Sequence, residues 1–267
     1  MPSTRQINYR MTEREIYDPR PGSSLPLGAR GYSPNGRIFR MARASTVALT
    51  VGQLVRKPEN EIRYADMSVA TAVGAGNTKF TLTMNGPTIA LDDYRDGTVY
   101  FNDGPNQGHS YAIVGNSLTA ANGTLTIDIN TGLTIALTTS SKATIIKNRY
   151  DGVRVTEPSP VERTLGVVPV AVTASYYFWL QTGGPAIILQ DGNLFENRDV
   201  IPSQRIRGAT QSAGSAIVSD TVIMDALGNE KLTNVPAPAG AVPSNAFGYV
   251  LDPRVNTDYA LVQVELD

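Results

Sequence analysis

The chain has 267 residues, 23 basic and 24 acidic side chains, no cysteine and a single histidine, His109. This length is sufficient for one large domain or two small ones, and a net charge of −1 argues against a chain-wide electrostatic contact with nucleic acid. Without cysteine there can be no disulfides, thiolate nucleophiles or cysteine-ligated metals, and one histidine excludes sites that need two imidazoles. These exclusions favour a structural or binding protein over an enzyme, so we expect no catalytic residues, no cofactor and no metal.

Residues 1–36 predict an extended arm rather than a folded core. Five prolines with glycines between them break helical and strand periodicity, although residues 12–17 can form one helical turn. Residues 1–43 carry eight arginines against three acidic residues, a surplus of +5 that leaves −6 for residues 44–267. Arginine suits bidentate pairing with carboxylates, which predicts an arm lying on an acidic neighbouring subunit; the alternative is a solvated, disordered tail. The side chains assigned to this contact are Arg5, Arg10, Arg14, Tyr17, Arg20, Arg30, Arg37, Phe39 and Arg40.

Short β-strands separated by turn residues are predicted from residue 37 to the end, and no helix of ordinary length is predicted. The fold class is therefore all-β, with a sandwich or barrel body. Residues 37–74 and 151–267 are expected to form the main β-domain, and residues 75–150 an inserted or second β-domain. The predicted strands lie at 37–43, 46–51, 67–73, 78–84, 97–101, 110–114, 124–129, 133–137, 143–147, 153–155, 165–173, 176–182, 186–189, 216–224 and 260–266.

The most aromatic segment is the run Tyr176, Tyr177, Phe178 and Trp179. We expect these rings to form sheet core or an oligomer interface, because aromatic side chains are prominent in both. Stacking on nucleic-acid bases or on sugars is the alternative. No basic residues interleave with the run, so no nucleic-acid partner is expected.

Membrane association is not expected either. The longest apolar stretch, residues 166–174, is too short to cross a bilayer as a helix and contains Pro169. The first residues have no apolar region of the kind found in secretory signals.

A cluster of carboxylates, Asp92, Asp93, Asp96 and Asp103, invites a calcium-loop interpretation. The EF-hand spacing would need an oxygen ligand where Tyr94 stands and a glutamate where Asp103 stands, with helices on both sides. A structural loop is favoured instead. A Ser–His–Asp triad would have to be built on His109, which is expected to be an ordinary hydrogen-bonded loop residue.

Three sets of short motifs, spread over most of the chain, carry a resemblance to a known family. They are Leu27-Gly28-Ala29-Arg30 with Gly36-Arg37-Ile38-Phe39-Arg40; Leu165-Gly166-Val167 with the segment from Tyr176 to Gly184; and Asp96-Gly97-Thr98-Val99 with Gly108-His109-Ser110-Tyr111-Ala112-Ile113. These motifs resemble those of head decoration, or cement, proteins of tailed bacteriophages. The chain departs from that pattern at Phe178, where glycine is usual, and at Asp96-Gly97, where Gly-Gly is usual.

The resemblance implies a structural virion protein that binds the outer surface of the expanded capsid and bridges major capsid subunits. The expected partner is the phage major capsid protein, and the expected location is the capsid exterior after assembly in the host cytoplasm. A homo-oligomer is expected, with a trimer favoured because capsids offer threefold sites. Binding only to the assembled state would stabilise it by mass action.

Two alternatives remain at the level of sequence. The first is a carbohydrate-binding, adhesin or tail-fibre module, or a glycan hydrolase that uses two facing carboxylates from the cluster at residues 92–103. The second is the major capsid protein itself, which the absence of a predicted long helix disfavours.

Overall fold

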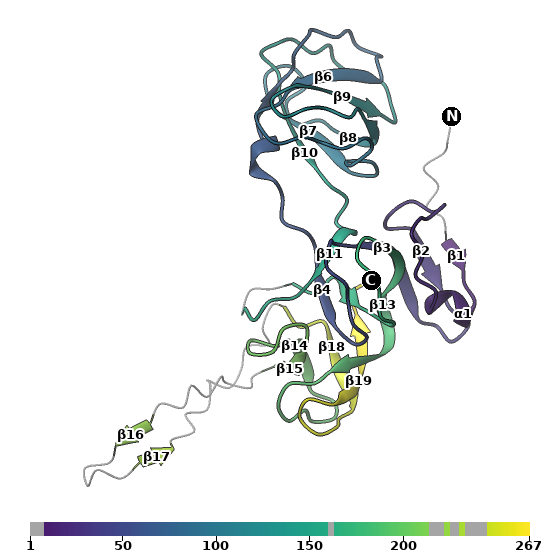
Figure 1. Cartoon of the computed structure of the whole chain (residues 1–267), viewed down its shortest axis with the longest axis vertical. Helices are drawn as coiled ribbons and strands as arrows, with labels where there is room; N and C mark the ends of the chain where they lie inside the picture. The colour runs from purple at the N-terminus through teal and green to yellow at the C-terminus, as the bar shows by residue number, and fades with distance from the viewer. Residues whose placement is uncertain (1–7, 160–162, 214–221, 225–229, 233–244) are drawn as a thin grey trace. The chain divides into compact units, whose positions relative to one another are not determined.

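The computed structural model describes residues 8–159, 163–213, 222–224, 230–232 and 245–267 (Figure 1). The described part is nearly all β, as predicted. Its elements are β1 (Asn8–Arg10), α1 (Glu13–Ile16), β2 (Arg30–Tyr32), β3 (Ile38–Ala44), β4 (Leu54–Arg56), η1 (Ile62–Tyr64), β5 (Met67–Ser68), β6 (Lys79–Thr83), β7 (Thr98–Asp103), β8 (Ser110–Asn116), β9 (Thr124–Ile129), β10 (Lys142–Ile146), β11 (Asp151–Val155), β12 (Gly166–Val167), β13 (Tyr177–Leu189), β14 (Asp199–Pro202), β15 (Thr210–Ser212), β16 (Val222–Met224), β17 (Glu230–Leu232), β18 (Gly248–Asp252) and β19 (Tyr259–Glu265). Among the described residues, no helix has the length and apolar character needed to cross a membrane.

The chain divides into two compact units. Unit 1 comprises residues 1–25, 29–57 and 152–267, and unit 2 comprises residues 26–28 and 58–151. The second unit thus begins at residue 58 rather than at the predicted 75. The reason is that Tyr64, Met67 and Val69 are buried in the hydrophobic core of unit 2, so the segment before residue 75 belongs with the strands that follow it.

Unit 2 is a small closed barrel of six strands in the order β5-β10-β7-β8-β9-β6. A bridge between Val69, just after β5, and Leu82 of β6 joins the two ends of this order. Burial alternates along the strands, as their sequences predict: Val99 and Phe101 of β7 are buried, whereas Tyr100 is exposed. Alternation places one apolar face inside the barrel, where the rings of Phe80 and Phe101 lie 5.5 Å apart.

Unit 1 is built around the 13-residue strand β13. Its first half pairs with β3 and its second half with β19. The pairing of β3 with β13 closes β3, β11, β4, β12 and β13 into a ring, from which β19, β18, β14 and β15 continue the sheet. The change of partner occurs at a register irregularity between Gln181 and Gly183, and Gly184 has a positive φ of 83° that an L side chain rarely adopts.

Residues 8–25 and strand β2 belong to unit 1 and pack against its sheet. We call residues 8–25 the N-terminal segment; it contains β1, which pairs in parallel with β2, and the short helix α1. Met11 and Ile16 are each only 1% exposed and form a hydrophobic cluster with Phe39, Met41 and Trp179. The prediction of a separate extended arm is therefore wrong for these residues, because the apolar side chains between the prolines bury against the sheet. Residues 12–17 do form the helical turn that was predicted.

Several predicted strands are shorter than their apolar runs suggest. Leu49 and Val172 form a single bridge, and so do Val73 and Leu137, in place of the strands predicted at 46–51, 133–137 and most of 165–173. In the run 46–51 only Leu49 is buried, and its neighbours face solvent. In the run 133–137 both Leu133 and Leu137 are buried, but only Leu137 forms a bridge. Of the strand predicted at 216–224, the described part is Val222–Met224, and the rest lies outside the described residues.

Candidate functional site

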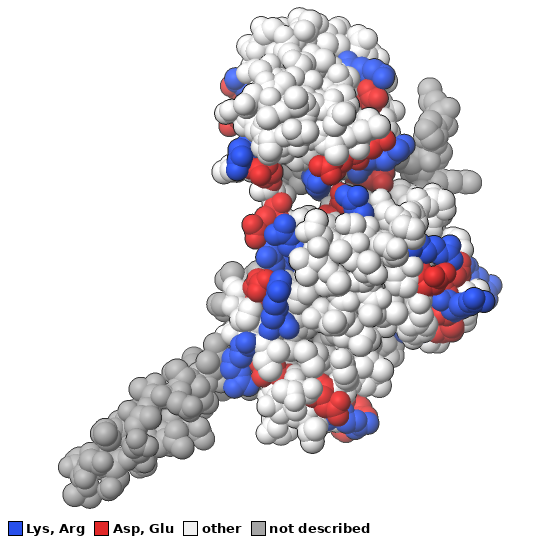
Figure 2. All heavy atoms as spheres, in the orientation of Figure 1, with Lys and Arg blue, Asp and Glu red and all other residues white. Residues whose placement is uncertain are grey.

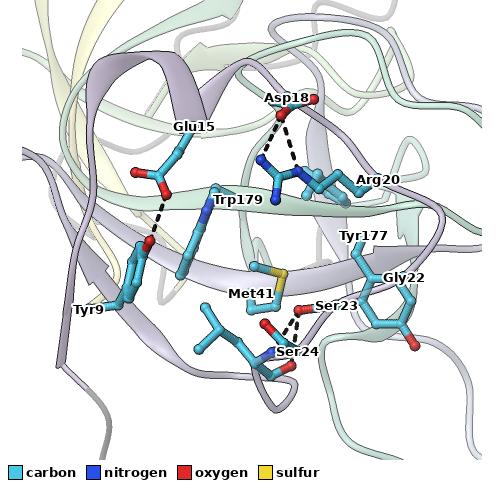
Figure 3. Close-up of a pocket in the computed structure, with 12 residues that line it drawn as sticks. Tyr9, Glu15, Asp18, Arg20, Gly22, Ser23, Ser24, Met41, Tyr177 and Trp179 are labelled. Carbon is cyan, nitrogen blue, oxygen red and sulfur yellow. Dashed lines mark hydrogen bonds and ion pairs between the residues drawn. The ribbon is translucent and has the colours of Figure 1, made fainter.

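A pocket of about 140 Å³ lies in unit 1, between the N-terminal segment and the paired strands β3 and β13 (Figure 3). Its floor is formed by Met41 of β3 together with Phe178 and Trp179 of β13. The rest of the lining comes from the N-terminal segment and the edge of β13: Tyr9, Glu15, Asp18, Arg20, Gly22, Ser23, Ser24, Leu25 and Tyr177. The pocket therefore joins the two regions that the sequence singled out, the arginine-bearing start of the chain and the aromatic run.

Stacked aromatic rings form one side of the pocket. The rings of Tyr9 and Trp179 lie 5.8 Å apart between centroids and are inclined by 15°. Trp179 is only 5% exposed, because the N-terminal segment covers this face of β13. Offset stacking of this kind adds about 0.5–1.5 kcal/mol to the free energy gained from burial, so the rings fasten the segment to the sheet as well as lining the pocket.

The carboxylate of Glu15 is hydrogen-bonded to the hydroxyl of Tyr9 beside the pocket. The Tyr9 hydroxyl donates to Glu15 Oε1 at 2.6 Å, and this hydrogen bond is the main reason why the pKa of Tyr9 is raised. The backbone N–H of Thr12 donates to Glu15 Oε2 at 2.7 Å and is the principal cause of a lowered pKa at Glu15, followed by the bond from Tyr9. Glu15 is therefore an ionised anchor for the pocket wall, with both carboxylate oxygens already accepting hydrogen bonds.

An ion pair lies on the rim of the pocket. Arg20 donates to Asp18 Oδ2 through Nε at 3.1 Å and Nη2 at 2.7 Å. The backbone of Arg20 also forms a two-way bridge with Tyr177: Arg20 N–H donates to the Tyr177 carbonyl at 2.9 Å, and Tyr177 N–H donates to the Arg20 carbonyl at 2.8 Å. Both side chains of the ion pair are about half exposed, so they are accessible to a binding partner.

The lining of the pocket combines apolar and polar groups. Apolar and aromatic surfaces form the floor, and polar groups that could orient a ligand lie at the rim, which is the usual composition of ligand-binding pockets. The hydroxyl of Ser23, which lines the pocket, donates to the carbonyl of Leu25 at 3.1 Å within its own loop. His109 belongs to unit 2 and does not line this pocket.

The arginines assigned to partner contact separate into two groups. Arg10, Arg14 and Arg20 are exposed, and Tyr17 is 52% exposed; Arg5 lies outside the described residues. The remaining assigned residues are engaged within the fold.

Phe39 is fully buried, so its assignment to partner contact is wrong. Arg37 pairs with Glu13, and Arg40 pairs with Asp267 at 2.6 Å. Arg30 is half-buried and lies 4.9 Å from the ring centroid of Tyr32. Three of the arginines that make up the surplus of positive charge, Arg30, Arg37 and Arg40, therefore form contacts within unit 1.

Three residues of the aromatic run, Tyr177, Phe178 and Trp179, lie at the start of strand β13. Phe178 and Trp179 are core residues at 2% and 5% exposure, while Tyr176 and Tyr177 are half-buried. Sequence reasoning did not assign eight of the pocket residues to a site: Tyr9, Glu15, Asp18, Gly22, Ser23, Ser24, Leu25 and Met41. A readable signal for Glu15 was present in Thr12-Glu13-Arg14-Glu15, because this spacing forms a capping box.

The carboxylate cluster of unit 2 is occupied by structural contacts. Asp93 pairs with Lys147 at 2.7 Å, and Asp92 pairs with Arg95 at 3.1 Å. Asp96 accepts from the backbone of Leu27, and Asp103 from its neighbour Gly104. Within the described ranges no group of three or more histidine, cysteine or acidic side chains could hold a metal ion.

His109 is a hydrogen-bonded loop residue, as the sequence predicted. Its Nδ1 lies 2.8 Å from the hydroxyl of Thr134, and that hydroxyl lies 2.9 Å from the hydroxyl of Tyr111. The imidazole therefore belongs to a hydroxyl network on unit 2.

Comparison with known proteins found no match: no family model, no curated protein and no solved structure is similar enough to the chain to identify it. The resemblance to cement proteins rests on the sequence motifs.

Proposed function

We propose that this protein is a structural virion protein that binds the outer surface of a tailed-bacteriophage capsid and bridges its major capsid subunits. The observation that supports this function best is the N-terminal segment. It carries exposed arginines and a half-exposed tyrosine, and it is fastened to the aromatic strand β13 by stacking and backbone pairing. A fixed basic and aromatic surface of this kind suits contact with acidic protein surfaces.

Figure 2 shows basic side chains over the N-terminal segment, interspersed with acidic ones. Glu13 and Asp18 neutralise Arg37 and Arg20. We therefore assign the electrostatic part of the capsid contact to Arg10 and Arg14, which are exposed on either side of the buried Met11. The contact would be made by a few positioned arginines rather than by a diffuse charge on a free arm.

The test is co-sedimentation of the purified protein with expanded heads assembled without it. We expect the wild type to sediment with the heads and to raise their heat tolerance. The double variant Arg10→Gln/Arg14→Gln should bind at least about tenfold more weakly, because each arginine can donate charge-assisted hydrogen bonds to a capsid carboxylate. Arg254→Gln serves as the control, since Arg254 is exposed and pairs with Asp252 elsewhere on unit 1.

Substitution is a sharper experiment than deletion of residues 1–36. Deletion would uncover Trp179 and remove the buried side chains of Met11 and Ile16, each of which contributes about 1.5–3 kcal/mol through burial. A truncated chain could then lose binding because it unfolds. Failure of the intact protein to sediment with any such head would refute the proposed function.

We also propose that the protein acts as a homo-oligomer, with a trimer as the favoured form. A trimer matches the threefold positions that capsids offer, and several contacts on one lattice strengthen attachment through multivalency. Light scattering of the protein in solution and counting of copies per head measure this directly. A monomer both in solution and on the head would contradict it.

The second candidate is a carbohydrate-binding module, and the pocket of Figure 3 favours it. Aromatic surfaces next to Asp18 and Arg20 offer both apolar contact and hydrogen bonding to a sugar. Under this alternative, Tyr177→Ala would abolish binding to a glycan array and Arg10→Gln/Arg14→Gln would leave it unchanged. Under the virion function, the wild type shows no glycan binding.

A further inference from the structure

A second pocket of unit 1 contains three arginines. It has a volume of about 260 Å³. Arg56 comes from β4, Arg154 from β11, and Arg207 from the loop between β14 and β15. The pocket contains one acidic side chain, Glu157. Figure 2 shows several basic side chains, with acidic ones among them, on the side of unit 1 that carries β4 and β11.

Two of these arginines are direct cross-strand neighbours. In the antiparallel pairing of β4 with β11, Arg154 stands opposite Arg56. Residues directly opposite in such a pair project to the same face of the sheet, and like charges at these positions destabilise the sheet. A like-charge pair in direct register is the kind of local exception to sheet design that functional positions show, which directs attention to what this face could bind.

The surroundings favour a single carboxylate as the bound group. The hydroxyl-bearing residues Ser45 and Thr46 line the pocket together with Leu49 and Val155, which are 2% and 5% exposed. Guanidinium groups bind carboxylates in a bidentate manner, and a partly apolar lining strengthens such pairs by excluding water.

Glu157 and Val47 discriminate among anions. Glu157 pairs with Arg207 at 2.8 Å, so its negative charge would repel a doubly charged phosphate more strongly than a carboxylate. Val47 lines the same pocket and is 57% exposed, which gives an apolar contact for the rest of a peptide. A glutamate or aspartate within a peptide chain satisfies both conditions.

We propose that the pocket formed by Arg56, Arg154 and Arg207 binds an acidic segment of a protein partner, with a carboxylate placed between Arg154 and Arg207. The contact is separate from the one assigned to Arg10 and Arg14. It rests on the chemistry of this pocket and does not require that the partner be a capsid protein.

The experiment is calorimetric titration of the full-length protein with a tri-glutamate peptide capped at both ends. A tri-glutamine peptide and inorganic phosphate are the comparison probes. We expect tri-glutamate to bind at low ionic strength and to weaken as salt is added, because exposed charges are screened. Arg154→Gln/Arg207→Gln should weaken binding at least about tenfold, the loss expected for one charge-assisted hydrogen bond.

Arg254→Gln is a matched control. The side chains of Arg254 and Asp252 are 54% and 44% exposed, almost the same as the 53% and 43% of Arg207 and Glu157. This variant should bind tri-glutamate as the wild type does. Urea unfolding of the double variant, followed by the fluorescence of Trp179, checks that the fold is retained; Arg154→Lys provides a milder variant that keeps the charge.

Three results would overturn the proposal. They are equal affinity for tri-glutamine, unchanged affinity in the folded double variant, and displacement of tri-glutamate by phosphate at equal or lower concentration. None of them bears on sedimentation with capsids, so failure here is distinguishable from failure of the proposed function.

Discussion

Gly31 lies where β2 passes under the indole of Trp179. A Cβ atom at this position would stand 2.8 Å from Met11 Sδ and 2.9 Å from Trp179 Cζ3, closer than real Cβ atoms approach other atoms. The absence of a side chain therefore allows the N-terminal segment, β2 and β13 to pack in one cluster. The same cluster forms the floor and one wall of the candidate site.

We predict that Gly31→Val lowers the free energy of unfolding by about 1–3 kcal/mol, the usual cost of overpacking a core. Gly22→Val is the control, because no atom lies within 4 Å of a Cβ placed there, and its effect should stay within about 0.5 kcal/mol. Urea unfolding monitored by Trp179, the one tryptophan of the chain, measures both. Equal effects of the two variants would contradict the packing argument.

At the scale of elements, an ion pair connects β3 to the residues after β19. Arg40 donates to Asp267 through Nη2 at 2.6 Å and through Nε at 2.7 Å, and the Thr182 hydroxyl donates to the same carboxylate at 2.7 Å. Burial alone would raise the pKa of Asp267, but the hydrogen bonds from Arg40 and Thr182 outweigh it, so the pKa is lowered.

This lowered pKa fixes the pH dependence of the contact. Because the carboxyl binds protons more weakly in the folded chain, its contribution to stability is complete above its ordinary pKa and is lost as the pH falls through the folded value. We predict that Asp267→Asn lowers the free energy of unfolding at pH 7 by about 1–3 kcal/mol. The difference from the wild type should shrink in acid.

The midpoints of urea unfolding, measured from pH 7 down into the acid range, test this effect. Glu265→Gln, at an exposed position of β19, is the control. If the difference between Asp267→Asn and the wild type were the same at pH 7 and in acid, the hydrogen-bonded carboxylate would not be its cause.

At the scale of the whole molecule, the two units have separate hydrophobic cores. The core of unit 2 includes Phe80, Phe101 and Leu125, and the clusters of unit 1 draw on other residues. We therefore expect damage to one core to leave the other largely protected, since local opening follows cooperative units.

Gly97 allows a test of this independence. A Cβ there would clash with the backbone carbonyl of Ile146 and stand 2.8 Å from that of Tyr94. We predict that Gly97→Ala increases amide hydrogen exchange in β6 to β10 and leaves β13 and β19 unchanged. Gly74→Ala, where the nearest atom lies at 3.5 Å, should change neither. Faster exchange in β13 for Gly97→Ala would show that the units unfold together.

The sequence left open whether residues 75–150 form a separate domain, but its local patterns were enough to predict the all-β class and most strands of unit 2. These features depend on alternation over a few residues, for example Leu125 and Ile127 in β9, and on turn residues between strands, both of which are local. It also directed attention to the first arginines and to the aromatic run. Of these residues, Arg20, Tyr177, Phe178 and Trp179 line the candidate site.

The positions of those residues relative to one another depend on the tertiary fold. Met11 and Ile16 occur among prolines and arginines, and their burial depends on Trp179, far along the chain. The ion pair of Arg40 with Asp267 joins residues 227 positions apart, and the pairing of Arg154 with Arg56 follows from strand register. A local sequence pattern cannot predict such contacts, because these side chains meet only when the sheet closes.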